Sequence, residues 1–237
     1  MIKGIHTSAM AMRQGILRQE ITADNLANAN TTAFKRDRMF ARELLAAESA
    51  QSNPLSIETE RWTDFAPGAF NPTGDSFDLA LQNRGFFVVS DGTNEFYTRN
   101  GHFERSADGQ MVDVMGRAVQ GEGGNITLPA GLMTVSPDGT VSVDGTVIDR
   151  LRVVNFDDPQ TLLKAAGSAF IRSEETAAEL PVESPVVRQG FLEGSNVDAV
   201  HEMVNMISTA RTYEINARLL TTQDETLRHT VNEVGRV

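Results

Sequence analysis

The sequence predicts an α+β fold in which long N- and C-terminal α-helices pack together, coiled-coil-like, and accompany a central all-β domain rich in hairpins. Three observations support this prediction. Apolar residues recur at steps of three and four at both chain ends, Asp-Gly pairs punctuate the middle, and short β-branched runs lie between those pairs. A chain of 237 residues is long enough for one substantial core with helical ends.

The N-terminal segment predicts a helix of about 25 residues, roughly 38 Å long. Its apolar seam is narrow and contains small side chains, and Gln19 is its one polar member. Such a seam favours close packing against other helices. The seam consists of Ile2, Ile5, Ala9, Met12, Ile16, Gln19, Ala23 and Leu26.

The C-terminal segment repeats this pattern, with Asp224 as its polar member. Ser195 and Asp198 form a capping-box-like start, with Asn196 as an equally good N-cap, so we expect a helix from about Val197. Two interpretations stay open: the two helices form an intramolecular hairpin, or their seams also serve other copies. The seam consists of Met203, Met206, Ala210, Tyr213, Ala217, Leu220, Asp224, Leu227, Val231 and Val234.

The middle of the chain predicts a series of β-hairpins. Asp-Gly pairs at 91–92, 108–109, 138–139 and 144–145 lie beside runs such as Gly85-Phe86-Phe87-Val88-Val89. Residues 43–75 have turn chemistry but weak periodicity, which favours an extended connector. We therefore predict four parts: an N-terminal axial helix and signature motif (1–34), a connector (35–74), a central β domain (75–190) and a C-terminal axial helix (191–237).

Charge and composition exclude several classes of function. The net charge is −11, yet residues 1–42 carry seven basic and three acidic side chains. An acidic chain with one short basic region argues against nucleic-acid binding, and the asymmetry favours head-to-tail contact between copies. The chain has no cysteine, no apolar run of membrane-spanning length and no signal-peptide-like apolar segment. We expect neither membrane insertion nor a cleaved export signal.

No catalytic, cofactor-binding or metal-binding residues are predicted. The four histidines lie apart, and no zinc-binding helix motif or nucleophile elbow occurs. Gly121-Glu122-Gly123-Gly124 lacks the following Lys-Ser/Thr of a phosphate loop and favours a plain turn. Because a site can assemble from scattered residues, an enzyme remains an alternative, as does a monomeric β-domain binding module.

A motif beyond the first seam carries more specific information. The segment Ala23-Asp24-Asn25-Leu26-Ala27-Asn28-Ala29-Asn30-Thr31-Thr32-Ala33-Phe34-Lys35-Arg36 resembles the N-terminal signature of the bacterial flagellar rod and hook proteins. Physically, the asparagines are helix-terminating residues, Phe34 is a hydrophobic anchor, and Lys35 and Arg36 can pair with an acidic neighbour. Many members have Gly where this chain has Ala33, and an Ala is compatible with a compact turn of negative φ.

Further blocks resemble the same family in the right order. Residues 73–89, Tyr97-Thr98-Arg99-Asn100-Gly101 and residues 109–112 resemble its central β region, and residues 191–197 and 203–214 resemble its C-terminal signature. The glycine-rich run at 121–124 makes the chain more similar to the proximal than to the distal rod type. The short chain excludes the longer hook subunit.

The resemblance implies a structural subunit of the torque-transmitting basal-body rod, located in the periplasmic space and exported by the flagellar type III apparatus without a cleaved signal. The distal rod type is the alternative within the family. Outside it, a rod-associated peptidoglycan hydrolase is the enzymatic alternative. The implied partners are copies of itself or closely related rod proteins, other flagellar axial proteins and the type III export apparatus, with no cofactor.

Assembly is expected to use residues of both terminal regions. Heterologous contacts that do not close generate filaments, so seams at the two ends suit a helical polymer. The residues predicted at the subunit interface are Ile5, Met12, Ile16, Asn25, Leu26, Asn28, Phe34, Lys35, Arg36, Asn196, Met203, Met206, Tyr213, Leu220 and Leu227.

Overall fold

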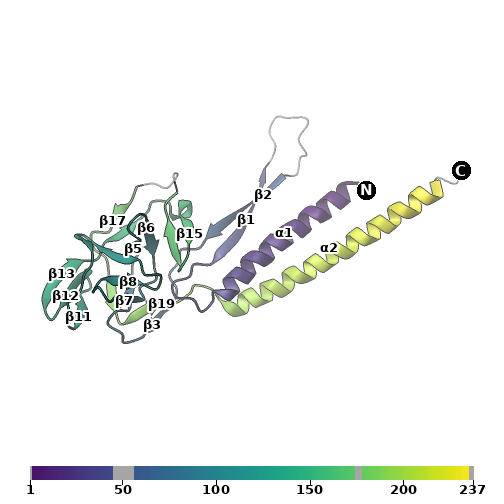
Figure 1. The fold of residues 1–237 in the computed structure, drawn as a ribbon. Coiled ribbons are helices and arrows are strands. Elements are labelled where there is room, and N and C mark those ends of the chain that lie inside the picture. The colour runs from purple at the N-terminus through teal and green to yellow at the C-terminus, as the bar shows by residue number, and fades with distance from the viewer. Residues whose placement is uncertain (1, 45–55, 174–177, 235–237) are drawn as a thin grey trace. The chain divides into compact units, whose positions relative to one another are not determined.

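A computed structural model describes residues 2–44, 56–173 and 178–234 of the chain (Figure 1). The chain divides into two compact units, each built from separated segments. The helical unit consists of Met1–Ala27, Asp37–Trp62 and Asp198–Val237. The β unit consists of Asn28–Arg36 and Thr63–Val197.

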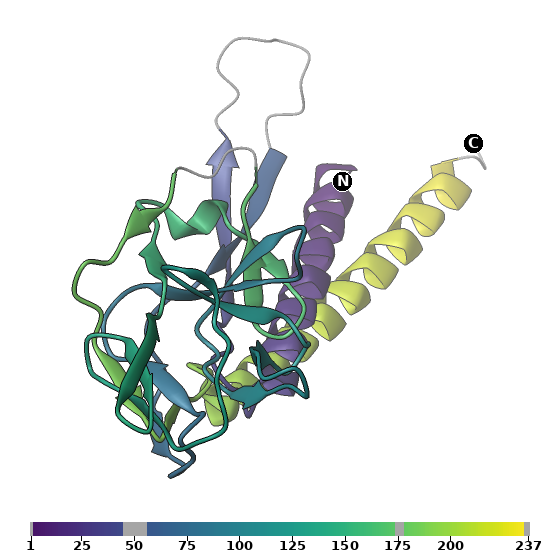
Figure 2. The ribbon, with the colours of Figure 1, turned by 60° about the vertical axis from the view of Figure 1, so that its left-hand side comes forward.

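Two long helices dominate the helical unit. Helix α1 (Ile2–Ala27) and helix α2 (Ala199–Val234) pack side by side in both ribbon views (Figures 1 and 2), which confirms the predicted helix pair. The side chain of Asp198 accepts hydrogen bonds from the N–H groups of Val200 (3.0 Å) and His201 (3.1 Å). Asp198 is therefore the N-cap of α2, and the predicted cap at Ser195 or Asn196 was wrong because both lie before the first helical turn.

A two-stranded sheet accompanies these helices. Strands β1 (Asp37–Leu44) and β2 (Ser56–Thr63) pair with each other. They lie within residues 35–74, for which the sequence predicts only an extended connector. The predicted division of the chain into four parts stays a proposal.

The β unit contains short strands, and every pairing given by its register is antiparallel. The largest sheet runs β15-β16-β6-β5-β9-β8-β7, with β10 on β9, and β14 on β5 and β17; smaller sheets are β11-β12-β13, β18-β4 and β19-β3. The predicted central β domain rich in hairpins is confirmed. The strand bounds are β3 Phe70–Pro72, β4 Leu79–Leu81, β5 Phe86–Ser90, β6 Glu95–Thr98, β7 Phe103–Arg105, β8 Met111–Asp113, β9 Ala118–Gly121, β10 Gly124–Asn125, β11 Met133–Val135, β12 Thr140–Val143, β13 Thr146–Arg150, β14 Val153–Asn155, β15 Leu163–Ala165, β16 Ala169–Ile171, β17 Leu180–Pro181, β18 Val187–Gln189 and β19 Phe191–Glu193, with a 3-10 turn at Pro159–Thr161.

Strand β5 separates two hydrophobic clusters, which explains its uninterrupted apolar sequence. Successive side chains of a strand point to opposite faces, so Phe87 enters one cluster and Phe86 enters the other. The ring of Phe87 packs edge-on against Phe103 at 5.4 Å between centroids, and Tyr97 packs against Phe156 at 4.9 Å. A strand buried on both faces fixes the centre of the β unit.

The turns agree with the Asp-Gly pattern in the sequence. The glycines of all four pairs have positive φ, between 81° and 92°, a conformation that glycine adopts without steric cost. Ala33 is different, because it has a φ of 56° and is fully buried. The expectation of a negative φ at Ala33 was therefore wrong: the chain holds an alanine in the left-handed conformation that explains why a glycine suits this position.

Candidate assembly interface

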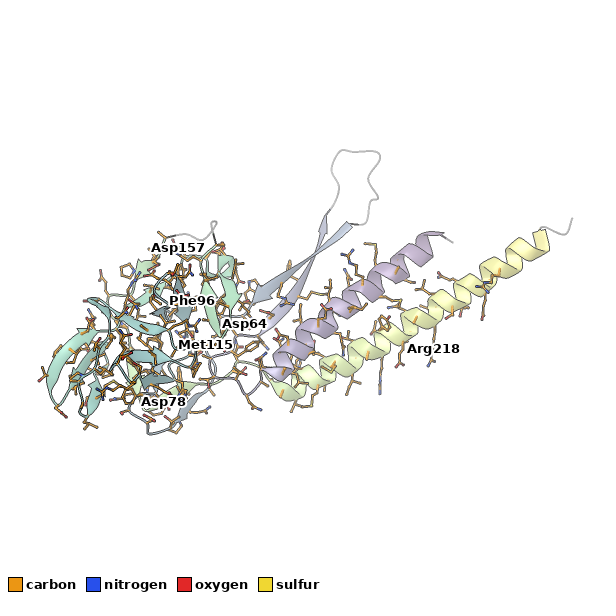
Figure 3. The ribbon with its side chains drawn as sticks, in the orientation of Figure 1. Asp64, Asp78, Phe96, Met115, Asp157 and Arg218 are labelled. Atoms are coloured by element: carbon orange, nitrogen blue, oxygen red, sulfur yellow. The ribbon has the colours of Figure 1, made fainter. Side chains whose placement is uncertain are left out.

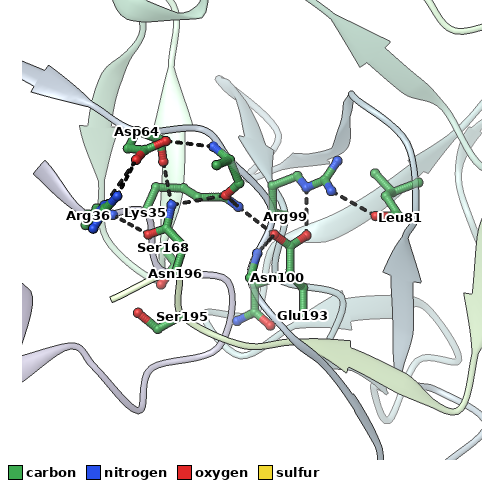
Figure 4. Close-up of polar contacts among 12 residues, drawn as sticks. Lys35, Arg36, Asp64, Leu81, Arg99, Asn100, Ser168, Glu193, Ser195 and Asn196 are labelled. Atoms are coloured by element: carbon green, nitrogen blue, oxygen red, sulfur yellow. Dashed lines mark hydrogen bonds and ion pairs between the residues drawn. The ribbon is translucent and has the colours of Figure 1, made fainter. Parts of the chain in front are cut away.

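A buried ion-pair network joins the end of the N-terminal signature to β19. The carboxylate of Glu193 is fully buried, pairs with the ammonium of Lys35 and accepts a hydrogen bond from Arg99 Nε at 2.9 Å (Figure 4). Glu193 Oε1 also accepts from the backbone N–H of Gly68 at 3.1 Å. One carboxylate thus holds donors from three separate segments of the β unit.

Arg99 extends this network to backbone carbonyls. Its Nη1 donates to the carbonyls of Asn83 (2.7 Å) and Gly85 (2.8 Å), and its Nη2 donates to that of Leu81 at 2.8 Å. These carbonyls lie on the stretch that leaves β4 and enters β5. The planar guanidinium therefore fixes the path between the two strands.

The environment of Lys35 shows how strongly the network depends on pairing. Burial lowers the pKa of the Lys35 ammonium from its usual value, while the nearby Glu193 carboxylate acts in the opposite direction. Desolvation offsets much of the Coulombic gain of a buried ion pair, whereas removal of one partner leaves an uncompensated buried charge. The pair therefore specifies one way of docking the signature on β19.

A second polar cluster surrounds Asn196. Its Oδ1 accepts from the backbone N–H of Arg36 at 2.8 Å, and its Nδ2 donates to the carbonyls of Asp64 (2.7 Å) and Ala66 (3.0 Å). The guanidinium of Arg36 donates twice to Asp64 Oδ2, at 3.1 and 3.0 Å (Figure 4). Residues far apart in sequence thus share one set of hydrogen bonds.

Phe34 anchors the signature beside a cavity of about 520 Å³. Its ring is buried, and the ammonium of Lys164 lies 4.6 Å from the ring centroid while donating to the Lys35 carbonyl at 2.8 Å. A cation over an aromatic face is attracted by the ring quadrupole. The cavity lining includes Asn28, Thr31, Asn100, His102 and Ser168.

Within the helical unit, Asn25 acts as a clamp on the backbone of β1. Its Nδ2 donates to the Asp37 carbonyl at 2.8 Å, and its Oδ1 accepts from the Asp37 N–H at 2.9 Å. The side chain is buried, and its amide group binds the Asp37 backbone with one donor and one acceptor, as the backbone of a neighbouring strand would. The asparagine near the end of α1 therefore fixes the start of β1.

Helix α2 exposes an apolar stripe, defined here by Val200, Met203, Val204, Ile207, Ile215 and Leu219. These residues recur mostly at steps of three and four, so they gather on one side of the helix. That side also carries Arg218, which projects away from α1 (Figure 3). The buried side of α2 includes Glu202 and Thr209. The apolar stripe thus lies away from the buried seam of the helix.

A groove of about 360 Å³ lies between α1 and α2. Gly15 supplies a small position in it, and the partly exposed side chains of Ile16 and Tyr213 line it. Among the residues that the structure describes, Gln19 Oε1 is buried here and has no hydrogen-bond partner. An unpaired buried acceptor is costly, so the groove favours an occupant that donates a hydrogen bond.

Comparisons with known proteins identify the family. Models of three families match in order: "Flagella basal body rod protein" at residues 5–35, "Flagellar hook protein FlgE/F/G D1 domain" at 80–143 and "Flagellar basal body rod FlgEFG protein C-terminal" at 188–233. The chain is 34% identical to flagellar basal-body rod protein FlgF of Caulobacter vibrioides over 235 residues, covering 95% of this chain and 96% of the relative.

Other relatives extend this similarity. FlgF of Salmonella typhimurium is 34% identical, covering 93% of this chain and 94% of the relative, and FlgG of Agrobacterium fabrum is 32% identical, covering 87% and 89%. The chain belongs to the flagellar basal-body rod protein family. It is a structural subunit of the basal-body rod, similar to FlgF and FlgG, and not an enzyme. The enzymatic alternative of a peptidoglycan hydrolase is therefore wrong.

Family membership means that the rod subunit assembles with other rod or axial proteins. In the described part of the chain, no helix combines the length and apolar character needed to cross a membrane. Among those same residues there is also no group of acidic and histidine side chains suited to a metal ion.

The residues predicted at the subunit interface lie in three environments: buried, exposed and partly buried. Asn25, Phe34 and Lys35 are buried, each within one unit. Ile16, Met203 and Tyr213 are exposed on the helices. The side chains of Ile5 and Leu227 lie outside the described residues. Those that are partly buried are Met12, Leu26, Asn28, Arg36, Asn196, Met206 and Leu220. Their assignment to contacts between subunits stays a prediction.

Sequence reasoning missed Glu193, Arg99 and Asp64, which complete the networks around Lys35 and Arg36. Arg99 and Glu193 each lie in a segment quoted for the family resemblance. Glu193 follows Phe191 and Leu192, and a lone charge beside apolar residues is a signal for a buried ion pair, whereas Arg99 lies between Thr98 and Asn100 and carries no such signal. Nothing in the local sequence indicates that these two charges meet, because 94 positions separate them.

Proposed function

We propose that this chain is a subunit of the proximal rod, polymerising through its terminal helices with copies of itself or closely related rod proteins. The similarity to FlgF of two bacteria supports the proximal assignment, and the similarity to FlgG makes the distal rod the alternative. In this proposal the subunit contacts other axial proteins, is exported by the flagellar type III apparatus, and acts in the periplasmic part of the rod.

The exposed apolar stripe of α2 carries this proposal. It places six aliphatic side chains on one side of a helix, while the helix already packs against α1 elsewhere. Contiguous exposed apolar surface marks interaction sites in soluble proteins. The groove beside Gln19 supports the same conclusion, because its unpaired acceptor suits a donor from another helix. Both features suit a subunit completed by its neighbours.

Ile207→Asp tests the proposal. Because Ile207 is 55% exposed, an aspartate there leaves the free subunit folded but buries an unpaired charge in an assembled helical layer. We expect loss of rods when the variant replaces the wild-type chain, with an unchanged circular dichroism spectrum of the purified subunit. The measurement is electron microscopy of basal bodies from cells that carry only the variant.

Ile207→Leu is the matched control, because it keeps the apolar character and the volume of the side chain. It should restore rods to the wild-type number. Normal rods with Ile207→Asp would remove the stripe from the interface and favour a monomeric binding module. A trace of the chain at a distal position in imaged rods would favour the distal alternative.

A further inference from the structure

A charged residue, Arg211, lies in the middle of the apolar stripe of α2. Ile207 precedes it by one helical turn and Ile215 follows it by one, so all three share the exposed side of the helix. Arg218, seven residues further along, projects away from α1 on the same side (Figure 3). In the part of the chain that the structure describes, the Arg211 guanidinium has no ion-pair partner. A guanidinium that is covered without acceptors is costly, so a surface that packs on this stripe has to supply them.

The groove between α1 and α2 offers such acceptors. The carboxylates of Glu20 and Glu214 line it and belong to exposed residues, and Tyr213 supplies an aromatic ring. Gln19 Oε1, which is buried and has no hydrogen-bond partner among the described residues, adds an uncharged acceptor. Two carboxylates already outnumber one guanidinium, so this amide completes the set without further negative charge. Carboxylates, an amide oxygen and an aromatic face are the groups that an arginine side chain binds.

The groove has room for side chains and not for a whole helix. One helical turn, about 10 Å wide and 5.4 Å long, occupies roughly 400 Å³. The groove measures about 360 Å³. Gly15 keeps this space open, because a Cβ at this position would contact Tyr213 Cδ2 at 4.0 Å. A helix that packs over the groove therefore fills it by inserting one or two side chains.

We infer that the apolar stripe of α2 in one rod subunit packs over the α1–α2 groove of a second copy, and that Arg211 enters this groove. Its guanidinium donates to Gln19 Oε1 and pairs with Glu20 and Glu214 of the second copy. The inference rests on the proposed function and adds to it which surface meets which. Because the stripe and the groove are different surfaces of the chain, the contact is heterologous, and each added copy leaves one stripe and one groove for the next.

Charge reversal tests the role of Arg211. Arg211→Glu places a carboxylate against Glu20 and Glu214, so the number of rods in cells that carry only this variant should fall at least about tenfold. The triple variant Arg211→Glu, Glu20→Arg, Glu214→Arg exchanges the signs and should recover most of the lost rods. Arg84→Glu, at an exposed arginine of the β unit, is the matched control and should leave the number unchanged. Normal rods with Arg211→Glu, or no recovery in the triple variant, would overturn the inference.

Disulfide trapping identifies the two surfaces directly. The chain has no cysteine, so introduced thiols are the only ones in the subunit. Ile16→Cys places a thiol in the groove, and Ile207→Cys or Ile215→Cys places one on the stripe, one turn from Arg211 on either side. Mild oxidation of rods should link one of the two double variants into a ladder of copies and should link no single variant. Dimers of a stripe variant alone, or rods of both double variants without any ladder, would overturn the inference.

Gly15→Leu separates this inference from the proposed function. The added side chain fills the groove, so rods should be lost while the circular dichroism spectrum of the free subunit stays helical. Gly15→Ala is the matched control, because it adds one methyl group and should still form rods. Normal rods with Gly15→Leu would overturn the inference and leave the proposed function intact. Failure of the wild-type chain to restore rods in cells that lack it would contradict the proposed function, and oxidation of the purified cysteine variants would still decide on the pairing.

Discussion

At the scale of single residues, Glu193 is expected to contribute strongly to the stability of the β unit. It is fully buried and is shared by the cations of Lys35 and Arg99. Glu193→Ala should lower the free energy of unfolding of the β unit by about 3–5 kcal/mol, because it leaves two buried cations without their counterion. Chemical denaturation, followed by far-ultraviolet circular dichroism, measures this change in the free energy of unfolding.

The control for that substitution is Glu104→Ala, at an exposed glutamate of β7. Surface substitutions of this kind usually change stability by less than about 0.5 kcal/mol. A similar small effect for both variants would mean that the buried network does not hold the signature in place.

The partly exposed carboxylate of Glu95 makes the stability of the β unit depend on pH. Hydrogen bonds from Arg152 lower the pKa of Glu95 below its ordinary value of 4.5. The stabilisation is therefore present above pH 4.5 and is lost as the pH falls through the lowered pKa. The thermal midpoint of Glu95→Gln should therefore decline less than that of the wild type as the pH falls below 4.5 and through the lowered pKa of Glu95. Parallel pH profiles of the two proteins would contradict this assignment.

At the scale of elements, substitution of Gln19 is expected to have opposite effects on the stability of the free subunit and on its assembly into rods. Gln19→Leu removes a buried acceptor that has no partner in the described structure, which should raise the thermal midpoint of the free subunit, since such an acceptor costs about 1–3 kcal/mol. The same change removes the acceptor offered to an incoming helix, so rods should form less efficiently. Scanning calorimetry and counts of rods in electron micrographs provide the two measurements.

Gln19→Glu is a useful companion variant, because it keeps the acceptor but adds a charge beside the exposed Glu20 and Glu214 of the groove. It should impair both stability and assembly. If Gln19→Leu assembled as well as the wild type, the groove would not be occupied in the rod.

The same elements show what the sequence predicts and what it does not. Heptad spacing locates α1 and α2 to within two or three residues, because helical periodicity is a local property. It assigns their contact faces less well: Glu202 and Thr209 are buried, whereas Met203 lies exposed. The buried face is decided by the partner helix and by β1, neither of which is encoded in the spacing of one segment. Ala33 likewise takes a positive φ, and its N–H donates to the Glu193 carbonyl at 2.8 Å, a long-range contact that the local sequence does not encode.

At the scale of the whole molecule, the resemblance in ordered blocks along the chain predicts the family and the order of α and β regions. The long-range networks were not predictable, since Lys35 meets Glu193 and Arg36 meets Asp64 across the fold. Such pairings depend on how the β unit closes, not on neighbours in sequence. The residues expected to contact other subunits therefore divide into a buried group that organises the chain and an exposed group on the helices.

The division of the chain into interleaved units has a consequence for its synthesis. The β unit needs nothing beyond Val197, whereas the helical unit combines the first 27 residues with those that follow Asp198. A ribosome thus delivers every part of the β unit before it delivers α2. The groove lined by Gly15 and Tyr213 cannot exist until α2 has been made. A newly made chain therefore forms this groove late in its synthesis, which disfavours premature association with other copies during translation.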